Sequence, residues 1–385
     1  MPDVVVVGGG IIGAASAYEL ARRGVGVTLF ERAELAAGAS GRNQGWLVVS
    51  SHEHLGPMSQ ASIPMYEELI DSSPVPVRFD RESVGHLLIA SEPAGVDAAR
   101  EHAQQWEASG VHVERLGDEG IREVEPALAP GFAEGWLLDH GRRIDPGALT
   151  VALALRAREL GAVVRTHVNV RNLITAGDRV TGVVTDDGVL ASDAVVLAAG
   201  PWSAALARPL GLHLPVTGAR GWIVELDAPP GTVRHMVEEE DGTWSDEDAL
   251  PTAGDLASGT TREPGVSVIL HQSHDHAIVC GASHQPALRA EPEDTDAPSR
   301  ITSRAVRLIP SLADLEVRGI RWGIRPMTPD GRPIIGWLMD GLLAATGHGP
   351  EGVLLGGGTA ELVASFVVGG EPPFAAEAFD PARFG

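Results

Sequence analysis

Three glycines near the N-terminus have the spacing of a turn that binds a dinucleotide. Gly8, Gly10 and Gly13 form the pattern G-x-G-x-x-G, and Glu31 follows the last of them by 18 residues. In this pattern the first glycine permits a tight turn, the second lets the backbone approach a pyrophosphate, and the third lets the next helix pack closely. The start of that helix attracts phosphates, and the Glu31 carboxylate can accept hydrogen bonds from ribose hydroxyls. The spacing therefore predicts a dinucleotide site, and the acidic residue disfavours NADP.

The chain around these glycines has the elements that the motif requires. The unbroken β-branched run at 4–7 predicts a buried strand of a parallel sheet. Residues 11–24 predict a helix with Gly24 as its C-cap, and residues 25–31 predict a second buried strand. One βαβ unit of about 30 residues is the context that makes the glycine motif specific.

A second αβ stretch starts at residue 145. Asp145 occupies an N-cap position and Pro146 the first position of a helix that we expect to end near Gly161. Residues 163–200 then predict several short strands joined by Gly and Asp turns. The intervening residues are richer in His and Trp, so they predict a second domain inserted twice into the first, at 76–141 and 215–325.

Small and hydrogen-bond-donating residues after the second strand favour FAD over NAD. An NAD dehydrogenase would normally continue into another βαβ unit at this point. Instead, the chain has a stretch that can wrap the rest of an extended dinucleotide, formed by Ser40, Gly41, Arg42, Asn43 and Gly45.

The composition excludes several classes of function. The 385 residues carry 29 Lys or Arg against 52 Asp or Glu, a net charge of −23, and all 29 basic residues are arginine. The acidity disfavours binding to nucleic acid or to an anionic membrane surface, because both need clustered cations. The absence of lysine excludes Schiff-base aldolases, pyridoxal-phosphate enzymes and nucleotidases with a P-loop lysine. The length fits two domains.

Cysteine content and hydropathy indicate a soluble protein of a reducing compartment. The single cysteine, Cys280, permits neither an intrachain disulfide nor a Cys-based zinc cluster. The sequence has no run of 18 apolar residues, and its start lacks the charged beginning of a signal peptide. We therefore expect a cytoplasmic protein without a membrane span, with Cys280 as a small core residue.

Four segments resemble the D-amino-acid-oxidase-like FAD oxidoreductases, a family that includes glycine and sarcosine oxidases and bacterial D-amino-acid dehydrogenases. They are VVVVGGGIIGAASAYELARRGVGVTLFE, ASGRNQG, IDPGALTVAL, and GIRPMTPDGRPIIG with the later ATGHGPEGVLLGGGTAELVA. The segments lie in the family's order and are spread over the whole chain. The combination is specific for the family and says little about the substrate.

The resemblance implies an α/β fold with two interleaved domains. A Rossmann-like FAD-binding domain with a parallel sheet would be formed by residues 1–75, 142–214 and 326–385. A substrate-binding domain with an antiparallel sheet would be formed by residues 76–141 and 215–325. The flavin would lie between them.

The resemblance also assigns roles to individual residues. Residues 347–353 should run beside the flavin ring, and a helix starting near Thr359 should point its N-terminus at the pyrimidine end, where reduced flavin carries negative charge. Arg325 matches the arginine that holds the substrate carboxylate in glycine-oxidase-like members, unless it braces its own loop through Asp330. The expected catalytic residues are Arg325 and His348. The expected FAD-binding residues are Gly8, Gly10, Ile11, Ile12, Gly13, Glu31, Arg32, Ser40, Gly41, Arg42, Asn43, Gln44, Gly45, Val170, Ala199, Gly200, Trp202, Arg325, Gly349, Glu351, Gly352 and Val353.

The sequence departs from the family where relatives attach the flavin covalently. The attaching cysteine of sarcosine-oxidase relatives corresponds to a place near Gly323, and the segment ASGRNQGW contains no histidine. We therefore expect FAD to be bound without a covalent bond. The chain also has only two tyrosines, Tyr18 and Tyr66, although several amino-acid oxidases use active-site tyrosines. The substrate pocket has therefore diverged.

Several polar groups lie outside these motifs. Imidazoles are common metal ligands, but strand-like alternation favours scattered pocket or surface positions, without a metal, for His271, His274, His276 and His284. His52 and His54 follow the flavin-wrapping segment and could face the substrate. We expect the acidic run at 238–241 to be a solvated face, in an exposed loop at 236–263 that either has no function or covers the site.

These expectations combine into the oxidation of an amino acid or of a related primary or secondary amine. The substrate C–H beside the amine gives a hydride to flavin N5, which leaves an imine that water hydrolyses. One alternative is a 2-hydroxy-acid dehydrogenase on the same fold, and another is the flavin subunit of a heteromeric amine dehydrogenase. The electron acceptor would be oxygen or a quinone-type compound. The chain could form a homo-oligomer or bind a heteromeric partner.

Overall fold

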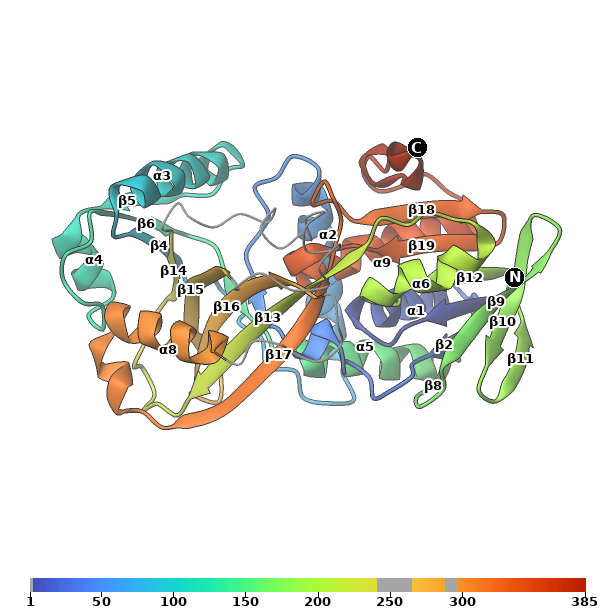
Figure 1. The fold of residues 1–385 in the computed structure, drawn as a ribbon, viewed down its shortest axis with the longest axis horizontal. Coiled ribbons are helices and arrows are strands. Elements are labelled where there is room, and N and C mark those ends of the chain that lie inside the picture. The colour runs from blue at the N-terminus through green and yellow to red at the C-terminus, as the bar shows by residue number, and fades with distance from the viewer. Residues whose placement is uncertain (1–2, 241–264, 288–295) are drawn as a thin grey trace.

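Two large sheets organise the chain, and they lie towards opposite ends of the molecule in Figure 1. The structure is a computed structural model that describes residues 3–240, 265–287 and 296–385. The long strands β13 (Thr217–Leu226) and β17 (Val317–Met327) extend from one end towards the other. A site formed between the two sheets can therefore draw residues from both.

The first sheet is parallel except at one edge. Within the described residues it has six strands in the order β18-β19-β12-β1-β2-β8, and only β18 runs antiparallel to its neighbour. Its strands are β1 (Asp3–Val7), β2 (Gly26–Phe30), β8 (Val163–Arg165), β12 (Ala194–Leu197), β18 (Ile334–Met339) and β19 (Leu342–Thr346). The glycine turn follows β1, which lies between β2 and β12. Ligands of open α/β sheets bind at the carboxyl ends of such central strands.

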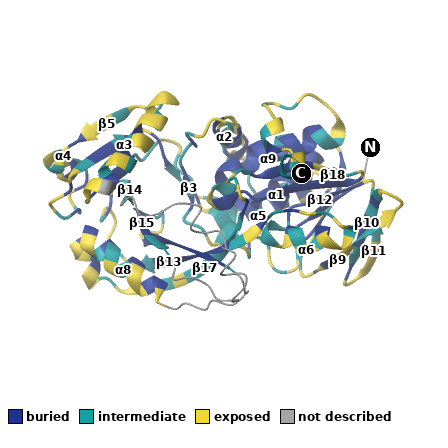
Figure 2. Cartoon of the chain, turned by 45° about the horizontal axis from the view of Figure 1, so that its top comes forward, coloured by how far each residue is buried: buried dark blue, intermediate teal, exposed yellow. Residues whose placement is uncertain are grey.

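Alternate residues of β1 pack into different cores. Val4 and Val6 pack with four helices, α1 (Ile11–Arg22), α2 (Leu55–Asp71), α5 (Pro146–Glu159) and α9 (Gly352–Val368). Val5 and Val7 pack on the other face with a three-stranded sheet and a short helix, formed by β9 (Val170–Ala176), β10 (Arg179–Thr185), β11 (Gly188–Ala191) and α6 (Ser203–Ala207). Burial on both faces explains the unbroken β-branched run. Figure 2 shows that α1 and α9 are buried along most of their length.

The second sheet is mostly antiparallel. Within the described residues it has eight strands in the order β17-β13-β16-β15-β14-β4-β6-β5, and only β14 and β4 pair in parallel. The strands not yet introduced are β4 (His86–Ala90), β5 (Val113–Leu116), β6 (Glu134–Leu138), β14 (Met236–Glu239), β15 (Gly265–Gln272) and β16 (Ile278–Pro286). Helix α8 (Ala297–Leu308) packs on β13, β15 and β16, and α3 (Pro93–Ala108) packs on β4 and β6. The remaining elements are α4 (Asp118–Val124) and the short pair β3 (Trp46–Leu47) and β7 (Arg142–Arg143).

The two sheets confirm the predicted fold class. The strands of the parallel sheet lie within 3–30, 163–197 and 334–346, and those of the antiparallel sheet lie within 86–138 and 217–327. The exact boundaries of two interleaved domains stay a prediction. Cys280 is fully buried in the core under α8, where burial raises the pKa of its thiol to about 12.

Two local predictions are wrong. Helix α9 begins at Gly352 rather than near Thr359, because its glycines are packing contacts and do not break the helix. A Cβ atom at Gly357 would lie 2.6 Å from the Ser62 Cα in α2. Residues 236–239, expected in an exposed loop, form β14 between β15 and β4. The rest of that acidic segment, from residue 241, lies outside the described residues.

Helix α9 is apolar because it is a core helix. By length and composition alone, the segment Gly349–Val368 could cross a membrane, with a mean hydropathy of 1.4. In the structure, 67 % of the apolar window is buried inside the protein. Burial against α1 and α2 accounts for its hydropathy.

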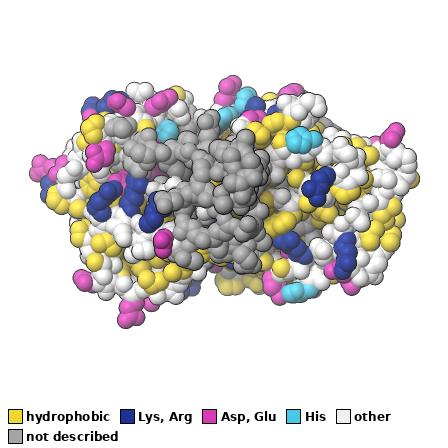
Figure 3. All heavy atoms as spheres, viewed as in Figure 1, with side chains coloured by type: hydrophobic (Ala, Val, Ile, Leu, Met, Phe, Trp, Pro, Cys, Tyr) yellow, Lys and Arg dark blue, Asp and Glu magenta, His cyan; other side chains and the backbone are white. Residues whose placement is uncertain are grey.

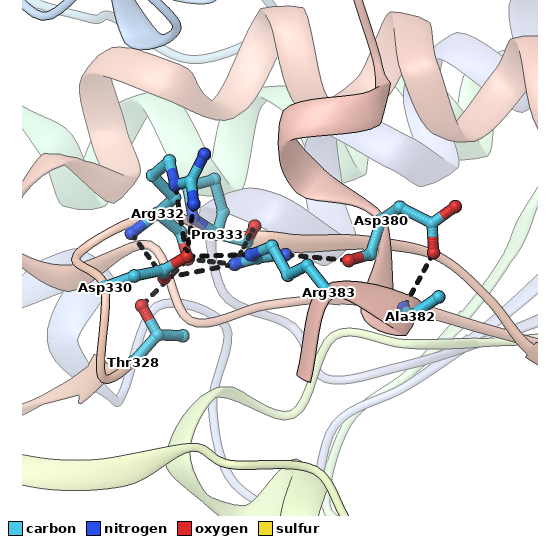
Figure 4. A network of polar contacts seen from close by, with 7 residues as sticks. All are labelled: Thr328, Asp330, Arg332, Pro333, Asp380, Ala382 and Arg383. Atoms are coloured by element: carbon cyan, nitrogen blue, oxygen red, sulfur yellow. Dashed lines mark hydrogen bonds and ion pairs between the residues drawn. The ribbon is translucent and has the colours of Figure 1, made fainter. Parts of the chain in front are cut away.

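Asp330 ties the C-terminal residues to the loop that precedes β18, as Figure 4 shows. Its Oδ2 accepts hydrogen bonds from Arg383 Nε at 2.8 Å and from Arg332 Nε at 3.1 Å. Partial burial acts to raise the pKa of Asp330, but hydrogen bonds from Arg383 and Arg332 outweigh it and lower the pKa to about 2. Arg383 also donates to the carbonyl of Pro333 at 3.1 Å. Asp330 therefore braces the C-terminus and does not engage Arg325.

Candidate active site

A cavity of about 920 Å³ lies between the two sheets. Its lining includes Gly8 and Glu31, which directly follow β1 and β2 of the parallel sheet, and His284 and Arg325 from the antiparallel sheet. This volume lies near the upper end of the range for ligand sites. The cavity therefore has room for a large cofactor beside a small substrate.

The glycine turn has the close contacts that its motif predicts. Gly8 has a φ of +112°, and a Cβ atom there would lie 2.4 Å from the carbonyl oxygen of Ala198. A Cβ atom at Gly13 would lie 1.9 Å from the carbonyl oxygen of Gly8. At Gly10, which lines the cavity, the nearest atom to such a Cβ is Ser40 Oγ at 3.0 Å. Gly8 and Gly13 thus shape the turn, and Gly10 keeps its cavity side open.

Glu31 has the hydrogen-bonding capacity that a ribose site needs. Its Oε2 accepts from the Gly9 N–H at 2.7 Å, and its Oε1 accepts from the Ala33 N–H at 2.8 Å. A carboxylate oxygen can accept more than one hydrogen bond, so both oxygens can still accept from a diol. Nearby, the Arg32 guanidinium lies 3.9 Å from the centre of the Trp202 ring, and both side chains line the cavity. This end can hold a ribose and a flat base.

The segment after β2 is locked by its own side chains and by the second sheet. Asn43 Nδ2 donates to the carbonyl of Ser40 at 2.7 Å, and Asn43 Oδ1 accepts from the Gly45 N–H at 2.8 Å. Arg321 on β17 donates to the carbonyl of Asn43 at 3.1 Å, and Arg42 donates to the carbonyl of Trp322 at 3.2 Å. These bonds hold the wrapping segment against β17.

His348 is a buried, neutral imidazole at the start of α9. Its Nε2 lies 2.9 Å from Thr359 Oγ1, and that hydroxyl donates to Met58 Sδ at 3.5 Å. Because the Thr359 hydroxyl donates its proton to Met58, it can only accept from His348, so the imidazole proton is on Nε2. The other ring nitrogen, Nδ1, is then an acceptor without a partner among the described residues. Burial lowers the pKa of His348 to about 3. His348 lines the cavity as a neutral acceptor.

Arg325 lies where the sheet leaves room for its guanidinium. Its Nη1 donates to the carbonyl of Ser283 on β16 at 3.0 Å. A Cβ atom at Gly221, on the intervening strand β13, would lie 2.3 Å from that same Nη1. Burial, and secondarily the charge of Arg325, hold the pKa of His284 well below its usual value. Arg325 and a neutral His284 therefore share this part of the cavity wall.

Gln44 is placed by a second glycine. A Cβ atom at Gly281 would lie 2.5 Å from Gln44 Nε2. Gln44 lines the cavity, and its Oε1 is buried without a hydrogen-bond partner. An unpartnered buried acceptor is costly unless a ligand satisfies it. Gln44 thus offers an acceptor to a bound N–H group.

The cavity collects most of the residues singled out from the sequence. Every predicted FAD-binding or catalytic residue lines it except Gly13 and Gly41. Gly13 packs against the backbone of the glycine turn, and Gly41 packs against the backbone of Ala36, whose carbonyl oxygen would lie 2.5 Å from a Cβ atom at Gly41. The sequence analysis did not identify four lining residues at the substrate-side end, which are Trp46, His86, Trp106 and Glu238. Their side chains come from four separate elements or loops, so no local motif marks them.

The other histidines and the tyrosines have mainly structural positions. His271 is buried and accepts from Trp46 Nε1 at 2.6 Å, and His274 Nε2 lies 3.0 Å from Asp80 Oδ1. His276 and His52 are exposed, and neither His52 nor His54 lines the cavity. Tyr66 is fully buried and donates to the carbonyl of Val353 at 2.7 Å. Within the described ranges, no three His, Cys, Asp or Glu side chains form a metal-binding group.

The sequence and the structure are similar to those of known flavoenzymes. The family described as "FAD dependent oxidoreductase" matches residues 3–366. The chain is 30 % identical to the glycine oxidase of Geobacillus kaustophilus, over 97 % of its own length and 94 % of that protein. It is 32 % identical to the D-amino acid dehydrogenase of Bradyrhizobium diazoefficiens, over 77 % of its own length and 66 % of that protein. The crystal structure of the Geobacillus kaustophilus glycine oxidase has a TM-score of 0.85 at 27 % identity and covers 98 % of each chain. The chain therefore belongs to the family of FAD-dependent oxidoreductases.

Proposed function

We propose that this protein oxidises an amino acid, or a related primary or secondary amine that carries a carboxylate. The observation that carries the proposal is the Arg325 guanidinium, which lines the same cavity as the glycine turn. A guanidinium can give a carboxylate two parallel hydrogen bonds, which fix its orientation as well as adding affinity. The names of the glycine oxidase and D-amino acid dehydrogenase relatives support the same class of substrate.

The residues present fit FAD along the cavity. Glu31 would accept from the adenosine ribose, the start of α1 would face the pyrophosphate, and residues 40–45 would wrap the middle of the cofactor. The turn at 348–352 and the start of α9 would face the flavin, where backbone N–H groups stabilise negative charge. When bound, FAD supplies the group that accepts the hydride from the substrate C–H next to the nitrogen.

The chain's own side chains would orient the substrate. Arg325 holds the carboxylate and thereby fixes the carbon that bears the amine. Gln44 Oε1 and His348 Nδ1 are both acceptors without a hydrogen-bond partner among the described residues, and either can accept an amine N–H. His284, held neutral, does not repel the amine. The chemistry then needs no strong base if the amine binds in its neutral form, and the imine released is hydrolysed by water.

Anaerobic reduction of the flavin by a panel of compounds tests the proposal. The FAD-loaded chain alone is mixed with amino acids of both chiralities, N-methyl amino acids, decarboxylated amines and 2-hydroxy acids. Bleaching of the flavin band by amino acids supports the proposal, and bleaching by hydroxy acids only supports the dehydrogenase alternative. A flavin that no compound reduces without an added partner protein supports the heteromeric alternative.

We also propose that FAD is held without a covalent bond. Gly323 packs against the segment after β2, since a Cβ atom there would lie 3.3 Å from Arg42 Cβ, and the attaching cysteine of relatives is absent near this place. Acid precipitation should therefore release the yellow colour into the supernatant. Colour that stays with the precipitated protein would contradict a non-covalent site.

A further inference from the structure

We infer that the substrate-side end of the cavity is a subsite for a cationic side chain, so that the preferred substrates are amino acids with a distal ammonium or guanidinium group. The inference rests on the proposed function and names the substrate class of the same site. It is carried by Glu238 and by the aromatic side chains around it.

Glu238 is a carboxylate in the cavity wall that pairs with no arginine among the described residues. Strand alternation in β14 points Val237 and Glu239 away from the face that bears Glu238. Glu239 is buried and is neutralised by Arg304 at 2.7 Å and Arg307 at 2.9 Å. Glu238 lines the cavity, and its one contact among the described side chains is His86 Nε2, 2.9 Å from its Oε2. The two neighbouring carboxylates therefore differ: Glu239 pairs with two arginines, whereas Glu238 faces the cavity and pairs with no described arginine.

The described neighbour of the Glu238 carboxylate is His86 Nε2, and the His86 ring is held in turn by a second histidine. His86 Nδ1 lies 3.3 Å from His140 Nε2, and both rings are buried. Burial, together with the nearby His86, lowers the pKa of His140 to about 3, so His140 is neutral. With its proton on Nε2, His140 donates to His86 Nδ1, and only a lone pair on its own Nδ1 lacks a partner. His86 is thus fixed between His140 and Glu238.

Two tryptophan rings pack against His86, the neighbour of this carboxylate, and line the same cavity. The Trp46 and Trp106 rings lie edge-on to His86, with ring centroids 5.3 Å and 5.5 Å away. Their indole N–H groups are already used: Trp46 donates to His271 at 2.6 Å, and Trp106 donates to the carbonyl of Val49 at 3.1 Å. The two indoles therefore offer the cavity aromatic surface. Aromatic surface together with a carboxylate favours a cation, whereas it would repel a second carboxylate.

The spacing between Arg325 and Glu238 fits a basic amino acid. Arg325 bonds to Ser283 on β16, and Glu238 lies on β14, two strands away, which is about 10 Å. Glu238 pairs with Ile269 on β15, and Ile269 pairs with Gly281 on β16, so these three residues lie side by side across the sheet. Gly281 and Ser283 are two residues apart, which is about 7 Å along the strand. The diagonal of about 12 Å matches a carboxylate and a distal cation separated by about three or four methylene groups, with a hydrogen bond at each end.

Binding of two isosteric probes tests the subsite without requiring turnover. 4-Guanidinobutanoate and 4-ureidobutanoate have the same shape and carboxylate but differ in the charge of the distal group, and neither has an α-amine. Titration calorimetry of the FAD-loaded protein should show at least about 10-fold tighter binding of the guanidino compound. Glu238→Gln should remove that preference, whereas the control Glu240→Gln, two residues away and outside the cavity wall, should keep it. Equal affinities in the parent protein, or a preference that survives Glu238→Gln, would overturn the inference.

Anaerobic reduction by arginine and citrulline separates this inference from the proposed function. These amino acids repeat the same contrast in charge while carrying an α-amine. Faster reduction by arginine, reduced to the citrulline rate by Glu238→Gln, supports both proposals. Equal reduction by the two amino acids leaves the proposed function standing and contradicts the cationic subsite. If neither these nor any other amino acid reduces the flavin, the proposed function fails, and the calorimetric result still decides whether a cation is bound.

Discussion

Two glycines on the antiparallel sheet make room for the polar side chains of the cavity wall. Gly221 leaves space for the Arg325 guanidinium, and Gly281 leaves space for the Gln44 amide. Both glycines lie within strands, where a larger residue would be favoured on propensity alone. Their presence is explained by the side chains that occupy the space above them.

Arg325→Ala should lower kcat/KM for carboxylated substrates by roughly 30- to several-thousand-fold, because removing one partner of a buried charge pair costs about 2–5 kcal/mol. Arg325→Lys should restore only part of the loss, since lysine lacks the planar fork. Gly221→Ala, which displaces the guanidinium without removing it, should raise KM roughly 10- to 100-fold. Flavin content should stay normal in all three variants. Unchanged kinetics of Arg325→Ala would show that the carboxylate is held elsewhere.

Glu31→Gln should weaken FAD binding while preserving the shape of the side chain. The lost charge-assisted contact to ribose costs about 1.5–3 kcal/mol, or roughly 10- to 100-fold in affinity. The ratio of flavin to protein after purification and an FAD titration of the apoprotein measure the effect. Glu34→Gln is the matched control, because Glu34 is exposed and pairs with His167. Full flavin occupancy of Glu31→Gln at low FAD would exclude Glu31 as the ribose ligand.

Residues within motifs could be predicted from the sequence, and isolated residues could not. The glycine turn, Glu31 and Arg325 carry local patterns or match a family segment. Glu238 lies in an acidic run that predicts a solvated face, and that prediction is wrong for Glu238, which lines the cavity, and for Glu239, which is buried. Glu239 is neutralised by Arg304 and Arg307, which follow it by 65 and 68 residues, and no local pattern could reveal this.

Among the elements, α9 depends on small residues for its contact with α2. A Cβ atom at Gly358 would lie 2.5 Å from the carbonyl oxygen of Met58, and one at Gly357 would lie 2.6 Å from the Cα of Ser62. The Ser62 hydroxyl accepts from the Gly358 N–H at 3.0 Å. The two helices can therefore approach only where α9 lacks side chains.

Gly358→Ala should destabilise the protein by about 1–3 kcal/mol, because the added methyl group meets backbone atoms that cannot move aside. A lower midpoint in chemical denaturation measures the effect. Gly352→Ala is the control within the same helix, since the nearest atom to its Cβ is His348 Cβ at 3.6 Å, an ordinary contact. Equal stability of the two variants would contradict the packing role of Gly358.

Element prediction succeeded where a short-range pattern exists and failed where partners are distant. The βαβ unit at the N-terminus and the helix capped by Asp145 are in place, and Asp145 accepts from the Ala148 N–H at 2.9 Å. The sequence predicts the start of α9 too late, because consecutive glycines indicate the end of a helix unless a second helix packs on them. Strand β14 was missed because its two neighbours, β4 and β15, lie far from it in the sequence.

At the scale of the whole molecule, the described part of one face carries charges of both signs. On the part of the face in Figure 3 that described residues form, acidic and arginine side chains are interspersed at both ends. The net charge of −23 is therefore not a single acidic patch on that face. Ion pairs such as that of Asp330 with Arg383 hold distant parts of the chain together (Figure 4).

Buried histidines should make the fold sensitive to mild acid. Burial lowers the pKa of His140, His271 and His348 to about 3 each, whereas in the unfolded chain their pKa is near 6.5. Between these values the unfolded chain binds more protons, so this stability is fully present above pH of about 6.5 and is lost as the pH falls towards 3. Asp330, whose pKa is lowered to about 2, loses its contribution only below pH of about 4.

Denaturation midpoints between pH 7 and pH 5 measure this dependence. Each buried histidine contributes up to about 1.4 kcal/mol per pH unit, so His140→Asn should flatten the curve. His213→Asn, at an exposed position, should leave the slope unchanged. A parent protein that is equally stable at both pH values would contradict neutral burial of these rings.

The central claim is that this cavity converts an amino acid into an imine with FAD as the oxidant. A single anaerobic turnover tests it most directly: the FAD-loaded protein is mixed with an excess of the amino acid that reduces it best, and reduced flavin, ammonia and 2-oxo acid are quantified. Oxidation of the C–H next to a primary amine, followed by hydrolysis, predicts one equivalent each of ammonia and 2-oxo acid for every flavin reduced. Reduction of the flavin by a primary amino acid without release of ammonia, or ammonia released without reduction of the flavin, would contradict the account.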